Sequence, residues 1–129
     1  MTARILVGTC SWADKTLVEC SRFYPPYVKT PEERLRYYAE QFPIVEVDST
    51  YYGLPSERNA ALWVERTPAH FTFDIKAFRL FTHHPTPVDA LPRDVRQELP
   101  PRGDRPNLYL RDLPREVVDA LWQRFASAL

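Results

Sequence analysis

Glu46, Asp48 and Lys76 carry the side chains of this sequence best suited to acid–base chemistry. Glu46 and Asp48 alternate with Val45 and Val47, so a β-strand here would place the carboxylates on one face and the valines on the other. The carboxylate face must be partly wet or ion-paired, because an unpaired buried charge is costly. We therefore take Asp48 as the candidate general acid or base and Glu46 as its electrostatic partner.

Lys76 ends a second alternating segment, in which Asp74 and Lys76 point away from Phe73 and Ile75. A lysine on a neighbouring strand keeps a carboxylate charged and lowers the pKa of that carboxylate. We include Lys76 with Asp48 among the candidate catalytic residues. The alternative is an ion pair that only satisfies buried charges and does no chemistry.

Hydroxyl, aromatic and cationic residues follow the predicted strands, and parallel sheets collect ligand groups at the carboxyl ends of their strands. Lys76 and Arg79 could hold a phosphate or carboxylate, and tyrosine or tryptophan rings could stack on a sugar or a base. The alternatives are that Arg79 pairs with Asp74 or Glu46, and that the rings are wall packing. The candidate ligand-binding residues are Thr9, Trp12, Ser49, Thr50, Tyr51, Tyr52, Arg79 and His83.

The histidines and cysteines give weaker signals. His83 and His84 with Asp48 would suit zinc or manganese, but adjacent histidines cannot easily face one ion, so we expect no metal site. Cys10 has no neighbouring histidine in the sequence to lower the pKa of its thiol, so we do not expect a nucleophile there. Cys10 and Cys20 lack metal-like spacing and are expected to be free thiols. The sequence identifies no cofactor.

Composition excludes several classes of protein. The 129 residues are enough for one domain, and 44% of them are hydrophobic and 26% charged, as in an ordinary soluble protein. Basic and acidic residues are equal at 17 each, so we expect no nucleic-acid partner. No apolar run approaches the roughly 18 residues of a membrane span, and the N-terminus lacks the apolar core of a signal peptide. We expect a cytoplasmic protein without a membrane partner.

Strands and helices are predicted to alternate along the chain. Proline and capping residues set their starts: Thr30 precedes Pro31, Ser56 precedes an apolar helix, and Asp112 precedes Pro114. The predicted elements are a buried strand over 4–9, a loop over 13–30, a helix from Pro31 to Phe42, a strand over 44–48, a helix from Ser56 to Thr67, a strand over 71–76, a proline-rich loop over 85–107 with one short helical piece, and a final helix from Asp112. This order indicates parallel strands joined by helical crossovers.

Several segments together resemble the domain-of-unknown-function 72 (YecE-like) family: Gly8-Thr9-Cys10-Ser11-Trp12, Phe23-Tyr24-Pro25-Pro26, Val45 to Tyr52, Trp63 to Pro68 and Phe71 to Thr82. The resemblance implies a TIM-barrel-like (β/α) fold of uncharacterised activity. The chain departs from the family pattern at Cys10 and Ser11, where Ser-Gly is usual, and at Asp48, where Asn is common. TIM barrels need about 250 residues. We therefore expect residues 1–129 to form a single partial barrel, the first three βα units, and to be inactive alone.

Two functions remain open. The first is binding or processing of a small anionic or sugar-like molecule at the strand ends, with Lys76 and Arg79 holding the anion. The second is a non-catalytic binding or interaction domain that uses the open face of the sheet and the segment from Pro85 to Pro106. A sheet covered on one side only leaves a face and two edges exposed. We therefore also expect self-association over the open face.

Overall fold

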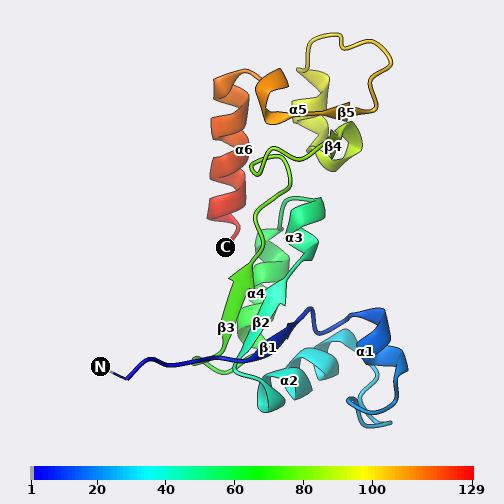
Figure 1. Ribbon diagram of the computed structural model, residues 1–129, viewed down its shortest axis with the longest axis vertical. Helices are drawn as coiled ribbons and strands as arrows, with labels where there is room; N and C mark the ends of the chain where they lie inside the picture. Colours follow the sequence, from blue (N-terminus) through cyan, green and yellow to red (C-terminus); the bar gives the residue numbers. More distant parts are fainter. Residues whose placement is uncertain (1) are drawn as a thin grey trace. The chain divides into compact units, whose positions relative to one another are not determined.

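The computed structural model describes residues 2–129, which divide into two compact units (Figure 1). Unit 1 comprises residues 2–48 and 61–75, and unit 2 comprises residues 49–60 and 76–129. The elements in chain order are β1 (Gly8–Cys10), α1 (Lys15–Glu19), α2 (Pro31–Gln41), β2 (Ile44–Val47), α3 (Ser49–Tyr52), α4 (Glu57–Glu65), β3 (Thr72–Ile75), β4 (Thr86–Pro87), the 3-10 turn η1 (Val88–Ala90), α5 (Arg93–Gln97), β5 (Asn107–Leu108), the 3-10 turn η2 (Leu110–Asp112) and α6 (Arg115–Ser127).

Unit 1 contains a three-stranded parallel sheet in the order β1-β2-β3 (Figure 1). The predicted α/β class and the parallel pairing are confirmed. The register aligns Thr9 with Val45 and Val45 with Phe73, so these three residues form one row across the sheet. Because side chains alternate along a strand, each row of the sheet faces the side opposite to that of the next row.

Helix α2 begins and packs as its sequence predicts. Thr30 caps it: the Thr30 hydroxyl accepts a hydrogen bond from the Glu33 N–H at 3.2 Å, and the Glu33 carboxylate accepts one from the Thr30 N–H at 2.9 Å. The buried side of α2 belongs to the core cluster of unit 1. This cluster contains Tyr38, Ala39, Val45, Val47 and Phe71, with Trp12, Leu17, Phe23, Phe42, Trp63, Phe73 and Ile75 packed around it. Valines of β2 therefore face a helix-covered core, as predicted.

The Tyr38 hydroxyl joins α2 to two strands of the sheet. Tyr38 is fully buried, and its oxygen accepts a hydrogen bond from the Thr9 N–H at 2.7 Å. It also lies 2.8 Å from the Thr9 hydroxyl and 3.3 Å from the Ile44 carbonyl oxygen. A buried hydroxyl needs such partners, and here they hold β1 against β2.

The predicted buried strand over residues 4–9 is wrong in its position. β1 covers only Gly8–Cys10, and Ile5 and Val7 are 86% and 64% exposed. β1 lies at the edge of the sheet and, within residues 2–129, pairs with β2 alone; before Gly8, Leu6 is half-buried, and Ile5 and Val7 stay exposed. Gly8 permits a close approach: a Cβ there would lie 2.0 Å from the Ile44 carbonyl oxygen.

The loop predicted over 13–30 contains the short helix α1. Asp14 caps this helix, because its carboxylate accepts hydrogen bonds from the N–H groups of Thr16 and Leu17 at 2.9 and 3.2 Å. The prediction treated Asp14 as a loop residue and missed the cap.

Unit 2 is built from short elements. β4 and β5 form an antiparallel pair, in which Thr86 is aligned with Leu108, and both of these residues are fully buried. The predicted loop over 85–107 includes η1 and α5 as its helical pieces. The Asp94 carboxylate of α5 is held by the Arg124 guanidinium of α6, with one contact of 3.0 Å. Phe81 packs edge-on against Trp122 and Phe125 of α6.

Two predictions about helices are wrong: the capping residue of α6 and the burial of Val64 in α4. Asp112 does not cap α6; it closes η2 instead, where its carboxylate accepts a hydrogen bond from the Tyr109 N–H at 2.8 Å. Val64, expected on the buried side of α4, is 69% exposed. Ser56 does cap α4, accepting a hydrogen bond from the Asn59 N–H at 3.2 Å. Between residues 2 and 129, none of the helices has the length and apolar character needed to span a bilayer.

Candidate functional site

The open face of the unit-1 sheet carries a row of polar side chains. Register aligns Cys10 with Glu46 and Glu46 with Asp74, so the three residues lie side by side across β1, β2 and β3. They alternate with the buried row that contains Val45, and Asp74 is exposed. We call Cys10, Glu46 and Asp74 the acidic row. The predicted division between a valine face and a carboxylate face is present in the structure.

A shallow hollow of about 260 Å³ lies over the acidic row. Its lining includes all three residues of the row together with Gly8, which carries no side chain to fill the space. The hollow is small beside the ~300–1,000 Å³ typical of ligand pockets. It is large enough to take one polar ring or a comparable part of a larger ligand.

The Cys10 thiol is a hydrogen-bond donor in this row. Its Sγ lies 3.4 Å from Glu46 Oε1, and burial together with this hydrogen bond raises the pKa of Cys10 from 9.0 to about 11. The negative charges of Asp48 and Glu46 raise the pKa further in the same direction. The thiol is therefore protonated at neutral pH.

Asp48 is half-buried directly after β2, and its effect on the pKa of Cys10 places its charge near the acidic row. The open face of unit 1 thus gathers three carboxylates and one thiol. Carboxylates accept hydrogen bonds from hydroxyl and ammonium donors and can exchange protons with them.

Two predicted ligand-binding residues of unit 1 have packing partners in the structure. The Thr9 hydroxyl is held by Tyr38 and by the Ser11 carbonyl oxygen at 3.1 Å. Trp12 packs edge-on against Trp63 and Phe73, with ring centroids 5.8 and 6.2 Å apart. These contacts give both residues a structural role, and ligand contact by either remains a prediction.

Within unit 2, Tyr51 organises a second group of predicted site residues. Ser49 to Tyr52, which directly follow the strand predicted over 44–48, form the short helix α3. The Lys76 ammonium and the Arg79 guanidinium each lie 5.4 Å from the centre of the Tyr51 ring. The Arg79 N–H donates a hydrogen bond to the Tyr51 carbonyl oxygen at 3.0 Å. We call Tyr51, Lys76 and Arg79 the cation–aromatic group.

The surroundings of this group are partly structural. Thr50 is buried and its hydroxyl donates to the Lys76 carbonyl oxygen at 2.6 Å. Arg79 Nε is buried and has no hydrogen-bond partner within residues 2–129, which leaves one donor of the guanidinium unsatisfied. Tyr52 is 62% exposed and packs edge-on against Tyr51.

The two adjacent histidines lie on an exposed turn of unit 2. His83 has a positive φ of 61°, and the His84 Nδ1 lies 2.8 Å from the Thr82 hydroxyl. The structure of residues 2–129 contains no group of three histidine, cysteine, aspartate or glutamate side chains that could hold a metal ion.

Sequence reasoning placed Asp74 on the polar face of its strand but named neither Asp74 nor Cys10 as a site residue. The alternation of β3 already places Asp74 opposite Phe73, so the face of Asp74 could be predicted. The neighbours of Asp74 and Cys10 could not, because they depend on the register of three strands that are far apart in the sequence.

These features define a parallel α/β chain whose sheet carries an apolar, helix-covered face and an acidic open face. The sequence pattern of the family described as "Protein of unknown function DUF72" matches residues 6–129, and the chain belongs to this family. It is 33% identical over 95 residues to the UPF0759 protein YunF of Bacillus subtilis (strain 168). The match covers 74% of this chain but only 31% of YunF. No solved structure matches the chain.

Proposed function

We propose that the acidic row binds a small hydroxyl-bearing molecule of the sugar or sugar-phosphate class. The observation that carries this proposal is the register of Cys10, Glu46 and Asp74 on one open face beneath a hollow of about 260 Å³. Each carboxylate offers two acceptor oxygens, and the hydroxyl groups around a sugar ring are hydrogen-bond donors. Hydrogen bonds to charged acceptors contribute about 1.5–3 kcal/mol each.

Asp48 is the proposed general acid or base, and Glu46 its electrostatic partner. Asp48 lies at the carboxyl end of β2, the position at which barrel enzymes carry catalytic groups. Asp48 is half-buried, so its carboxylate is partly shielded from water.

We propose the cation–aromatic group as a separate anion site, within unit 2, for a phosphate or a carboxylate. Arg79 offers a planar fork that suits phosphate or carboxylate oxygens, and Lys76 adds a point charge. The unsatisfied Arg79 Nε supports this assignment, since an oxyanion would supply the missing acceptor. The proposal concerns unit 2 by itself and does not depend on the acidic row of unit 1.

The fold we propose for the three strands is the TIM-barrel-like arrangement of the first βα units. The parallel order β1-β2-β3 supports it, as does the polar face opposite the helix-covered core. A crystal structure of YunF in which the matched strands lie outside a barrel would contradict this proposal.

Nuclear magnetic resonance (NMR) titration of the chain with glucose and glucose 6-phosphate tests the ligand class. We expect amide shifts around Cys10, Glu46 and Asp74 with both sugars. Asp74→Asn should weaken binding about 10-fold, because an exposed charged acceptor is lost while the shape is kept. Glu40→Gln, an exposed carboxylate on α2, is the matched control and should change nothing. Equal affinities of Asp74→Asn and the unaltered chain would remove the acidic row from the proposal.

The cation–aromatic group is tested in the same titration. Glucose 6-phosphate should also shift the amide signals around Tyr51 in unit 2, and Arg79→Met or Lys76→Met should weaken that binding about 10-fold, because the phosphate loses a charged donor. The shifts that glucose causes around the acidic row of unit 1 should not change. Shifts around Tyr51 that are equally strong in both variants would refute the anion site and leave the acidic row as a separate question.

A further inference from the structure

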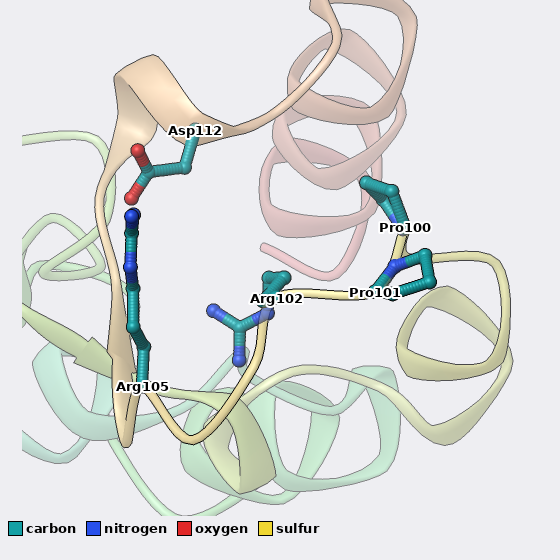
Figure 2. Close-up of a pocket in the computed structure, with 5 residues that line it drawn as sticks. All are labelled: Pro100, Pro101, Arg102, Arg105 and Asp112. Atoms are coloured by element: carbon teal, nitrogen blue, oxygen red, sulfur yellow. The ribbon is translucent and has the colours of Figure 1, made fainter.

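We propose a second binding site, in unit 2, that takes a small oxyanion in a hollow between the end of α5 and η2. The hollow has a volume of about 410 Å³ and is lined by Pro100, Pro101, Arg102, Arg105 and Asp112 (Figure 2). This volume lies within the ~300–1,000 Å³ of typical small-molecule sites. The site goes beyond the proposed function and shares no residue with the acidic row or the cation–aromatic group.

Two arginines give the hollow its chemistry. Figure 2 shows the Arg102 guanidinium directed into the space between the Pro100–Pro101 segment and Arg105. Within residues 2–129, neither Arg102 nor Arg105 has a carboxylate, hydrogen-bonding or aromatic partner. Guanidinium forks bind phosphate and carboxylate oxygens in pairs, so two arginines that line one hollow favour an anion there.

Asp112 limits the kind of anion that fits. Its carboxylate is fixed to the backbone by the Tyr109 N–H at 2.8 Å, and Figure 2 shows the charged ends of Arg105 and Asp112 turned toward each other. The hollow therefore has a net charge of +1: two guanidinium groups against one carboxylate. An anion that also carries a hydroxyl or ammonium donor would satisfy both signs, because Asp112 would accept its hydrogen bond.

The backbone around the hollow is held in place at both ends. Pro100 and Pro101 have restricted φ angles, so their segment loses little conformational freedom when a ligand binds. On the other side, Leu108 of β5 is fully buried and pairs with Thr86 of β4. Gly103, with φ +63°, provides the turn between the two arginines.

The test is a calorimetric titration of the chain with inorganic phosphate, succinate and glycerol phosphate at low ionic strength. We expect at least one of these anions to bind with a Kd on the order of 1 mM, weakening as salt is added. Arg102→Gln with Arg105→Gln should lower the affinity at least 10-fold. Arg102→Lys should lose part of the affinity, because it keeps the charge without the fork. Asp112→Asn should weaken glycerol phosphate relative to inorganic phosphate, because a ligand hydroxyl loses a charged acceptor.

Arg93→Gln, an exposed arginine on α5 outside the hollow, is the matched control and should bind like the unaltered chain. Thermal unfolding of each variant checks that the fold is retained. Absence of binding by all three anions would overturn the proposal. Unchanged binding in the Arg102→Gln, Arg105→Gln variant would also overturn the proposal. Each titration is carried out in the Lys76→Met, Arg79→Met chain, so that the anion site proposed above does not contribute to the binding measured at the hollow.

Discussion

Val45 and Val47 of β2 are buried against the core cluster, whereas the acidic row on the opposite side of the same sheet meets solvent. The two faces come from one alternating segment and differ in what covers them. The covered face must exclude charge, because an unpaired carboxylate there would lose its hydration. The open face can keep charge, because carboxylates there remain hydrated or hydrogen-bonded. Substitution on the two faces should therefore have opposite consequences for stability and binding.

The largest expected effect is on the covered face. Val45 has no exposed surface, so Val45→Asp would bury an unpaired charge and remove core contacts. We expect a loss of more than about 4 kcal/mol of unfolding free energy, enough to prevent folding of a marginally stable domain. Asp74→Val on the open face should change that free energy by less than about 1 kcal/mol. Circular dichroism and urea unfolding of both variants measure the contrast; similar losses would contradict the assignment of faces.

The next effect concerns the buried hydroxyl that joins the covered face to α2. Tyr38→Phe should cost about 1–3 kcal/mol, because the Thr9 N–H and hydroxyl lose their common partner in a buried setting. Tyr37→Phe is the control: within the part of the chain that the structure describes, the Tyr37 hydroxyl has no hydrogen bond. Chemical unfolding of the two variants gives the difference. Equal stability would show that the Tyr38 bonds do not hold β1.

A smaller effect is expected in the titration of Cys10 on the open face. In a Cys20→Ser chain, thiolate absorbance should rise with a midpoint near pH 11, because burial and Glu46 raise the pKa of the Cys10 thiol to about 11. Glu46→Gln removes a negative charge and should move the midpoint down toward the ordinary value of 9.0. A midpoint near the ordinary value of 9.0 in the chain that keeps Glu46 would show that Cys10 lies away from the carboxylates.

The smallest effect lies outside the sheet, at the exposed pair of α5 and α6. The Arg124 guanidinium lowers the pKa of Asp94 from 3.8 to about 2. Because the folded pKa is depressed, the stabilisation is present above pH 4 and is lost as the pH falls from about 4 to about 2. Asp94→Asn should flatten that part of the stability profile slightly, since exposed pairs contribute little. The control is Asp119→Asn, which removes the carboxylate of the exposed Arg115–Asp119 pair of α6. Acid unfolding curves of Asp94→Asn and Asp119→Asn give the comparison.

Local signals in the sequence were sufficient where neighbours in the chain decide the structure. Thr30 with Pro31 predicted the start of α2, and the alternation of Val45 and Glu46 predicted both faces of β2. The same rules should have identified Asp14 as the cap of α1, since its carboxylate acts only on the next few residues.

Other features depend on contacts that no local pattern contains. The run Ile5-Leu6-Val7 resembles a buried strand, but burial requires a neighbour on each side, and among the described residues β1 pairs only with β2. The hollow around Arg102 and Arg105 likewise depends on how η2 returns to the end of α5. Such sites depend on which distant segments of the chain pack together and on the register of the strands, and the periodicity of the sequence specifies neither.

The most direct test of the acidic row is carboxyl-carbon NMR of Glu46 and Asp74 during titration with glucose 6-phosphate. We predict that both carboxyl signals shift with one common affinity, that the shift of Glu46 requires an intact Asp74, and that the covered-face residue Val45 does not respond. Signals of Glu46 and Asp74 that stay unchanged up to saturating sugar phosphate would contradict the claim that the open face of the sheet is a ligand site.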